Sequence, residues 1–270
     1  MNIGVFDSGF GGLTVLRALL DRLPEANYIY LGDTARLPYG AKSQATVARY
    51  AVSSAHFLVE QQKADYLVIA CNTASALALD AIRDAVTVPV LGVIETGANA
   101  AQASTKTGDV LVMATAATVE SHAYSAACHE RGLRAIEKAA PLLVPLVEEG
   151  WVDHPVTTEV LCIYLAESLE EATLAALQPD TLVLGCTHYP LLRATFERAL
   201  PPFVRVIDSA EATATQVAAA LCLADKPCNP DGKPHTRRFY ATDSVNKFRN
   251  LGTRFLGQRI EQVELIDLGG

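Results

Sequence analysis

The sequence has 270 residues, of which 50% are hydrophobic and 19% charged, so it is long enough for one large or two ordinary globular domains and is neither disordered nor fibrous. Its net charge of −8 disfavours nucleic acids and anionic membranes as main partners, because both would repel it overall. The opening run MNIGVFDSG carries no basic residue, and no apolar run approaches the roughly 18 residues that span a bilayer, so we expect a cytoplasmic protein without a signal peptide or membrane segment.

Short apolar runs that predict strands alternate along the chain with segments of helical periodicity. The expected strands are 2–7, 27–31, 65–71, 90–94, 109–114, 180–186, 203–207, 237–241 and 262–266. Long helical patterns cover 43–63 and 154–177. This rhythm predicts an α/β fold with mainly parallel sheets and helices on both faces. Ligands of such folds bind beyond the carboxyl ends of the strands, so functional residues are sought there.

A glycine-rich segment, 9-GFGGLT-14, follows the first expected strand and opens a helix. It is close to a dinucleotide-binding fingerprint, but Thr14 stands where the third small residue should allow close helix packing. The alternative is that the glycines let the chain turn sharply, leaving backbone N–H groups free to hold an anion, such as a carboxylate, at the helix N-terminus.

Two cysteines occupy matching positions nearly half the chain apart. In 67-LVIACNTA-74 and 182-LVLGCTHY-189, an apolar strand and a small residue precede the cysteine, and two hydrogen-bonding residues and a helical pattern follow it. The repeat suggests two similar domains, each presenting one thiol, Cys71 or Cys186, at a strand end. We expect the following helix to favour the thiolate through its positive dipole end.

The other four cysteines fit ordinary structural positions. Cys128, Cys162 and Cys222 lie in helical patterns, where a free cysteine usually serves as a small buried apolar residue, and Cys228 lies in an exposed loop. No CxxC pair occurs, which disfavours a structural metal site and a disulfide redox pair. Two uses of the matched thiols stay open: one nucleophilic cysteine working with His188, or two acid/base groups on opposite faces of a substrate, as racemisation requires.

Six ordered segments carry a family resemblance: 3-IGVFDSGFGGLTVL-16, 31-LGDTARLPYG-40, 70-ACNTAS-75, 115-TAATVESHAY-124, 141-PLLVPLVEEG-150 and 184-LGCTHYPLL-192. With them the sequence resembles the glutamate racemases of the aspartate/glutamate racemase superfamily over nearly its whole length. The resemblance implies cofactor-independent interconversion of L- and D-glutamate, supplying the D-isomer for peptidoglycan. It also implies two α/β domains with the active site between them, formed by residues 1–96 with 209–270 and by 97–208.

The resemblance also implies roles for individual residues. Cys71 would deprotonate D-glutamate with the help of Asp7, and Cys186 would deprotonate L-glutamate with the help of His188, behind which Glu148 would lie. The implied substrate-binding residues are Asp7, Ser8, Pro38, Tyr39, Gly40, Asn72, Thr73, Thr118 and Thr187.

The residues alone leave alternatives open for these helpers and for the whole protein. Asp7 could merely cap the turn that follows it, His188 could be an ordinary helix N-terminal residue, and Glu149 could take the place of Glu148. The chain could instead be an aspartate racemase, another racemase of the superfamily, or a non-catalytic amino-acid-binding protein. We expect glutamate as its partner and no metal or cofactor, and the resemblance leaves a homodimer open. The basic stretch 226–260 leaves a secondary role such as gyrase inhibition open, although we expect it to be an ordinary solvated helical face.

Overall fold

The chain forms two parallel sheets, each flanked by helices, in a computed structural model that describes residues 1–223 and 235–269. The six-stranded sheet has the order β10-β9-β2-β1-β3-β4, and the four-stranded sheet has the order β6-β5-β7-β8. All strand pairs are parallel. The strands are β1 Asn2–Asp7, β2 Asn27–Gly32, β3 Tyr66–Ile69, β4 Val90–Gly92, β5 Asp109–Ala114, β6 Arg134–Ala139, β7 Thr181–Gly185, β8 Arg205–Asp208, β9 Arg237–Ala241 and β10 Glu264–Leu265. The predicted α/β fold with mainly parallel sheets is confirmed.

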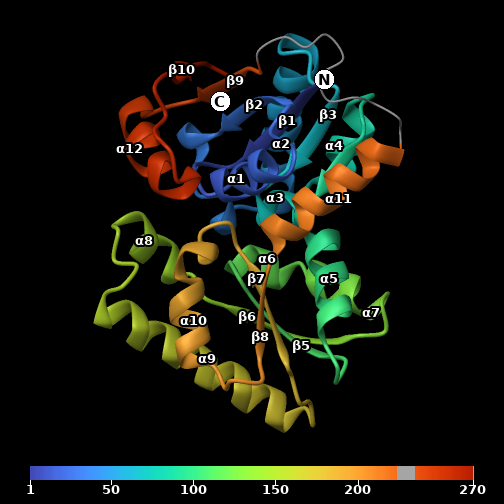
Figure 1. The fold of residues 1–270 in the computed structure, drawn as a ribbon, viewed down its shortest axis with the longest axis vertical. Helices are drawn as coiled ribbons and strands as arrows, with labels where there is room; N and C mark the ends of the chain where they lie inside the picture. Colours follow the sequence, from blue (N-terminus) through green and yellow to red (C-terminus); the bar gives the residue numbers. More distant parts are fainter. Residues whose placement is uncertain (224–234, 270) are drawn as a thin grey trace.

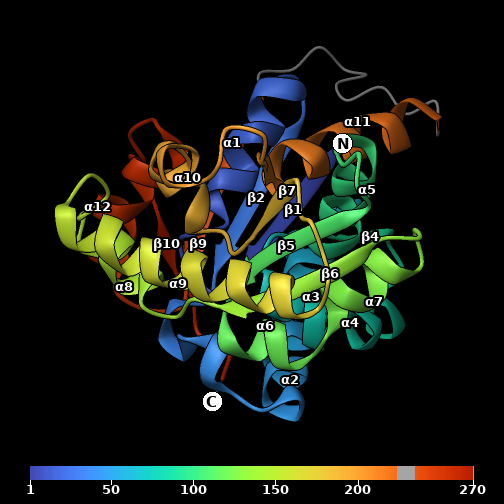
Figure 2. The same cartoon turned by 90° about the horizontal axis from the view of Figure 1, so that it is seen from below.

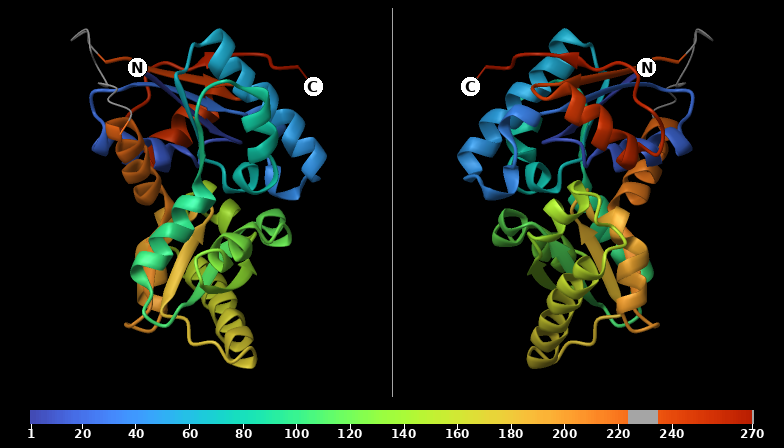
Figure 3. Two further views of the ribbon diagram at one scale, coloured as in Figure 1. Left: turned by 90° about the vertical axis from the view of Figure 1, so that its right-hand side faces the viewer. Right: turned by 90° about the vertical axis from the view of Figure 1, so that its left-hand side faces the viewer.

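Each sheet forms the centre of one lobe, and Figure 3 shows the two lobes in side view. We call the part around the six-stranded sheet the first lobe and the part around the four-stranded sheet the second lobe. The helices are α1 Leu13–Arg22, α2 Gln44–His56, α3 Asn72–Leu77, α4 Leu79–Ala85, α5 Val93–Ser104, α6 Ala116–Glu120, α7 Ala123–His129, α8 Leu143–Glu148, α9 Pro155–Leu174, α10 Arg193–Ala199, α11 Ser209–Leu223 and α12 Val245–Leu256. Figure 2 shows α9 lying across the four-stranded sheet.

Alternating side chains of the central strands are buried on both faces of the first sheet. Ile3 and Val5 of β1 pack into the core that contains α1 and α12, whereas Phe6 packs into the core that contains α2 and α4. A strand buried on both faces reads as a continuous apolar run, which is why the sequence predicts β1, β2, β3, β5 and β7 to within two residues at each end.

Three elements differ from their prediction. The edge strand β6 was not expected, because its sequence RAIEKA carries charged residues and its side chains are only partly buried. The expected strand 262–266 is reduced to the two residues of β10. The helical pattern 43–63 divides into α2 and a π-helical turn, Phe57–Gln61. No helix in the described part of the chain has both the length and the apolar character needed to cross a membrane.

Candidate active site

The first thiol lies where β3 gives way to α3. Cys71 is the N-cap of α3, and its Sγ accepts a hydrogen bond from the backbone N of Ala74 at 3.4 Å. The thiol donates to the Oγ of Ser8, also at 3.4 Å, and Ser8 directly follows β1. Because β1 and β3 are adjacent and parallel, their carboxyl ends bring these two side chains together.

Asp7 ends β1 and is buried with one oxygen unpaired. Its Oδ2 accepts from the backbone N of Gly9 at 2.9 Å, so Asp7 does hold the turn that follows it. Its Oδ1 has no hydrogen-bond partner among the described residues. Burial raises the pKa of Asp7 above its ordinary value, although the charge of His188 opposes this. A buried carboxylate with a free acceptor is suited to bind a cation or to take up a proton.

Burial also raises the pKa of the Cys71 thiol to about 12, and the neighbouring carboxylate of Asp7 adds to the increase. Hydrogen bonds from Ser8 and Ala74 lower it only in part. The expectation that the helix N-terminus favours the thiolate is therefore wrong for Cys71 in this arrangement. The six-residue helix α3 does not outweigh desolvation and a nearby negative charge.

The second thiol follows β7 directly and has a different neighbour. Cys186 Sγ lies 3.9 Å from Nδ1 of His188, and Nε2 of His188 lies 3.2 Å from Oε1 of Glu148. The structure thus brings together three residues that the sequence singled out, while Glu149 is exposed. The expected helix does not start at once, because a 3₁₀ turn over Tyr189–Leu192 precedes α10.

His188 is poised to carry a positive charge. Burial lowers its pKa, but the hydrogen bonds to Cys186 and Glu148 outweigh burial and raise the pKa to about 10. Burial raises the pKa of Glu148, but His188 and Lys247 outweigh it and hold that pKa below its ordinary value. At neutral pH this places an imidazolium between the carboxylate of Glu148 and Sγ of Cys186.

The glycine-rich segment 9–12 brings the two lobes into contact. A Cβ atom on Gly11 would lie 2.2 Å from Oγ1 of Thr187 and 2.7 Å from Nδ1 of His188. A Cβ atom on Gly12 would lie 2.5 Å from the Cβ of Asp7. The backbone of this segment therefore lies between the surroundings of Cys71 and those of Cys186. Close approach of the lobes is sufficient reason for the glycines, without a nucleotide.

A cluster of hydroxyl and amide groups includes the two residues that follow Cys71 on α3. Oγ1 of Thr73 is 3.0 Å from that of Thr115 and 3.2 Å from that of Thr118, so the cluster joins the two lobes. Oδ1 of Asn72 accepts from the hydroxyl of Tyr124 at 2.7 Å, and its Nδ2 has no partner among the described residues. Thr115 and Tyr124 were not predicted, although both lie in the segment 115-TAATVESHAY-124 that carries the resemblance.

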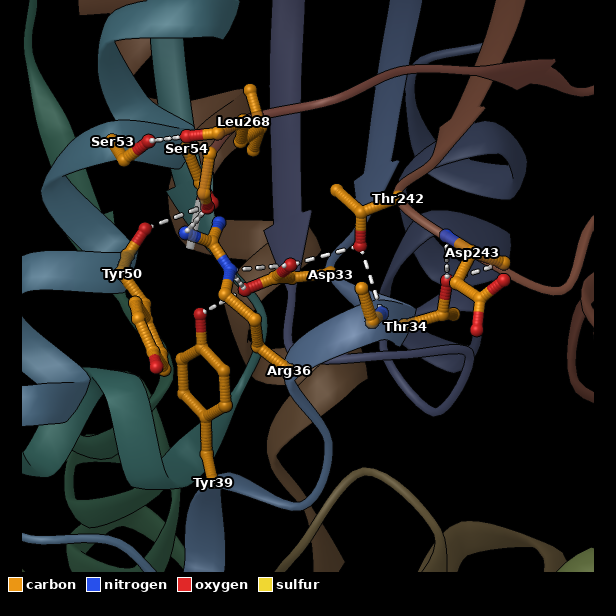
Figure 4. Close-up of polar contacts among 12 residues, drawn as sticks. Asp33, Thr34, Arg36, Tyr39, Tyr50, Ser53, Ser54, Thr242, Asp243 and Leu268 are labelled. Atoms are coloured by element: carbon orange, nitrogen blue, oxygen red, sulfur yellow. Dashed lines mark hydrogen bonds and ion pairs between the residues drawn. The ribbon is translucent and has the colours of Figure 1, made fainter.

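The predicted segment Pro38, Tyr39 and Gly40 is anchored to the first lobe through Tyr39. The Tyr39 hydroxyl donates to Oδ2 of Asp33 at 2.5 Å, and Figure 4 shows this hydroxyl pointing toward Asp33. Pro38 follows a cis peptide bond. We call Thr73, Thr115 and Thr118 the threonine cluster. A Cβ atom on Gly40 would lie 3.1 Å from the Cβ of Thr115, so the segment contacts this cluster at Gly40.

Two of the other cysteines, Cys128 and Cys162, lie on α7 and α9, outside this site. Cys128 is buried, as predicted, but Cys162 is exposed on α9, so its predicted burial is wrong. Cys228 and the side chain of Cys222 lie outside the described residues. No group of three potential metal ligands occurs among the residues described. Two cavities of about 580 and 610 Å³ lie along α11, and neither is lined by Cys71 or Cys186.

Sequence comparison relates the chain to racemases. A family model described as Asp/Glu/Hydantoin racemase matches residues 11–217. A glutamate racemase from Koribacter versatilis is 52% identical over 288 residues, covering 99% of this chain and 98% of the relative.

Solved structures agree with this relation over the full fold. A glutamate racemase from Bacillus anthracis has a TM-score of 0.89 and 38% identity, covering 98% of this chain and 97% of that one. A glutamate racemase from Francisella tularensis, solved in complex with D-glutamate, has a TM-score of 0.88 and 34% identity, covering 99% and 97% of the two chains. The chain therefore belongs to the Asp/Glu/Hydantoin racemase family, in which it stands with the glutamate racemases.

Proposed function

We propose that this racemase interconverts L- and D-glutamate in the cytoplasm without a cofactor and supplies D-glutamate for peptidoglycan. Its similarity to glutamate racemases over nearly the full length supports the substrate, as does the D-glutamate bound to the Francisella tularensis relative. We further propose that residues 1–96 with 209–270 form one domain and residues 97–208 the other. The membership of the two sheets supports this division, because β8 ends at Asp208 and β9 returns to the first sheet.

The observation that carries the proposal is the opposite charge beside the two thiols. Cys71 is a buried thiol next to the carboxylate of Asp7, whereas Cys186 lies next to the imidazole of His188. One thiol is thereby kept protonated while the other has a positive neighbour. A two-base racemase needs this pairing, because one group must remove the α-proton from one face while the other delivers a proton to the opposite face.

The steps follow from these positions. With L-glutamate bound, the thiolate of Cys186 takes the α-proton, and the thiol of Cys71 protonates the resulting carbanion from the other face. With D-glutamate the roles reverse. Asp7 accepts the proton that Cys71 must first release, and His188 gives its proton to the thiolate of Cys186. The thiolate of Cys71 then takes the α-proton, and the thiol of Cys186 protonates the carbanion from the other face. His188 and Glu148 stabilise the charge that changes at Cys186.

Unpaired polar atoms near Cys71 match the polar groups of an amino acid. Oδ1 of Asp7 is a free acceptor for the ammonium group, and Nδ2 of Asn72 is a free donor for a carboxylate. The hydroxyls of Thr73, Thr115 and Thr118 form a donor cluster for the second carboxylate. Ser8, Pro38, Tyr39, Gly40 and Thr187 complete the proposed binding set.

Circular dichroism of the purified protein with L- or D-glutamate tests the reaction, with both aspartate isomers as comparison substrates and EDTA as a metal control. We expect loss of optical activity from both glutamate isomers, no dependence on EDTA and little turnover of aspartate. Faster turnover of aspartate than of glutamate would show that aspartate, and not glutamate, is the substrate. Folded protein that changes neither glutamate isomer would refute the proposal.

The two thiols are tested by removing them one at a time. Cys71→Ala and Cys186→Ala should each lower turnover by roughly 10²–10⁴-fold, as loss of a general acid/base group does. Cys128→Ala removes a buried cysteine outside the site and serves as the matched control, with turnover close to that of the parent.

A further inference from the structure

Glu148 is held by partners from both lobes. Its Oε1 lies 3.2 Å from Nε2 of His188 in the second lobe, and its Oε2 accepts from Nζ of Lys247 at 3.3 Å. Lys247 belongs to α12 of the first lobe. Arg254 of the same helix reaches the backbone O of Glu148 at 3.5 Å. Figures 1 and 2 both show α12 beside α8, so the C-terminal end of α8 contacts a helix of the first lobe.

The same helix contacts the site at two further points. The ring of Phe255 packs edge-on against His188 with the centroids 5.1 Å apart. Nζ of Lys247 lies 5.4 Å from the ring centroid of Phe10, within the glycine-rich segment that touches Thr187 and His188. One helix of the first lobe thus contacts the imidazole, the carboxylate behind it and the segment in front of it.

The ion pair between Lys247 and Glu148 is too exposed to contribute much to the stability of the fold. The side chain of Lys247 is 56% exposed and that of Glu148 is 20% exposed. The other oxygen of Glu148, however, contacts a buried imidazole that faces a proposed catalytic thiol. A change in the orientation or protonation of Glu148 therefore changes the position or charge of the imidazole beside Cys186, even where its effect on stability is small.

We infer that Lys247 is a positioning residue for racemisation, which keeps Glu148 ionised and aimed at His188 while α12 rests on the second lobe. The inference rests on the proposed function, because it concerns the proton transfer at Cys186. It adds an electrostatic link between the lobes that is complete only when they are in contact. The charged groups that face Glu148 are His188, Lys247 and Arg254, with Asp7 close enough to interact with it.

The test compares three variants in both reaction directions. Lys247→Met keeps the length of the apolar stem and removes the charge, and Lys247→Arg restores the charge. Lys138→Met is the matched control, because Lys138 makes two ion pairs, with Glu167 and Glu171, within the second lobe and away from the site. The kcat and KM of each isomer are measured against pH.

We expect Lys247→Met to lower kcat for L-glutamate by about threefold to tenfold, somewhat more than an exposed ion pair alone would give. The acid limb of its kcat profile should move to higher pH, because a carboxyl group without its cationic neighbour has a higher pKa. Lys247→Arg should restore both values, and Lys138→Met should match the parent. A Lys247→Met profile equal to that of the parent, or a loss that Lys247→Arg does not restore, would overturn the inference.

A second measurement does not depend on turnover. The ring nitrogens of His188, followed by ¹⁵N NMR, should report the acid titration of Glu148, and this step should move to higher pH in Lys247→Met and not in Lys138→Met. An unchanged step contradicts the inference. A moved step in a protein that does not racemise glutamate would support the link and reject the proposed function.

Discussion

At the scale of single residues, the two thiols differ in the charge beside them more than in their backbone positions. Both follow a parallel strand and both are buried. Cys71 faces the carboxylate of Asp7, which helps to raise its pKa to about 12, whereas Cys186 faces an imidazole whose own pKa is raised to about 10. Cys71 is therefore held as a thiol beside a carboxylate, whereas Cys186 has a positive neighbour.

This difference predicts a directional effect of the two helpers. Asp7→Asn should lower kcat mainly for D-glutamate, where Cys71 is the base, and His188→Asn mainly for L-glutamate, each by about 10²-fold if the helper takes part in proton transfer. The equilibrium constant of a racemisation is one, so kcat/KM must fall equally in both directions and the asymmetry must be offset in KM. Initial rates over a range of both isomers measure this. Equal losses of kcat in both directions for both variants would refute the pairing.

The sequence singles out the two thiols and the residues proposed to assist them because each lies in a short motif that carries the family resemblance. It could not indicate Lys247, which reaches Glu148 only through contact between α12 and α8. It also misjudged Cys71, because the dipole of a helix can be read from a pattern, whereas the burial and the neighbouring charge that outweigh it cannot.

At the scale of elements, the loop between β2 and α2 is anchored by a buried carboxylate. Asp33 is fully buried and accepts from the side chains of Arg36, Tyr39 and Thr242, as Figure 4 shows. The guanidinium of Arg36 also lies 4.4 Å from the ring centroid of Tyr50 on α2. These bonds fix the loop that carries Gly40 to the threonine cluster.

Removing one of the side chains that donate to Asp33 should therefore affect both stability and substrate binding. Tyr39→Phe leaves a buried carboxylate with one donor fewer, which should lower the free energy of unfolding by about 1–3 kcal/mol. It should also raise KM for both isomers. Tyr66→Phe is the control, because Tyr66 is also buried but its hydroxyl makes no hydrogen bond to another described residue. Urea unfolding and steady-state kinetics compare the two variants. The prediction fails if both variants behave alike.

Prediction of elements succeeded where burial dominates and failed at the edge strand β6. Central strands such as β5 are fully buried and apolar, so the sequence identifies them. The edge strand β6 is only partly buried and carries Arg134, Glu137 and Lys138. Its place in the sheet depends on pairing with β5, which sequence periodicity does not reveal.

At the scale of the whole molecule, the charge on His188 links stability to pH. Its folded pKa of about 10 lies above its ordinary value of 6.5. The folded state therefore binds the proton more tightly than the unfolded state. The resulting stabilisation is fully present below pH 6.5 and is lost as the pH rises toward 10.

A comparison of unfolding curves tests this link. The difference in unfolding free energy between the parent and His188→Asn should shrink steadily as the pH rises from 6.5 to about 10. Other titrating groups affect both proteins alike and largely cancel in the difference. Urea unfolding at several pH values gives the result, and a difference that stays constant over this window would show that His188 is not protonated in the folded protein.

The most direct test of the two-thiol account is the hydrogen content of early product in D₂O. A thiolate on one face takes the substrate's proton, while the opposite thiol delivers a deuteron that it has exchanged with solvent. We predict that D-glutamate formed first from L-glutamate contains deuterium at the α-carbon, while unreacted L-glutamate keeps its protium, and that the same holds from D-glutamate. Mass spectrometry of the separated isomers measures both. Protium carried into the earliest product would contradict the account, because it would mean that a single base works on both faces.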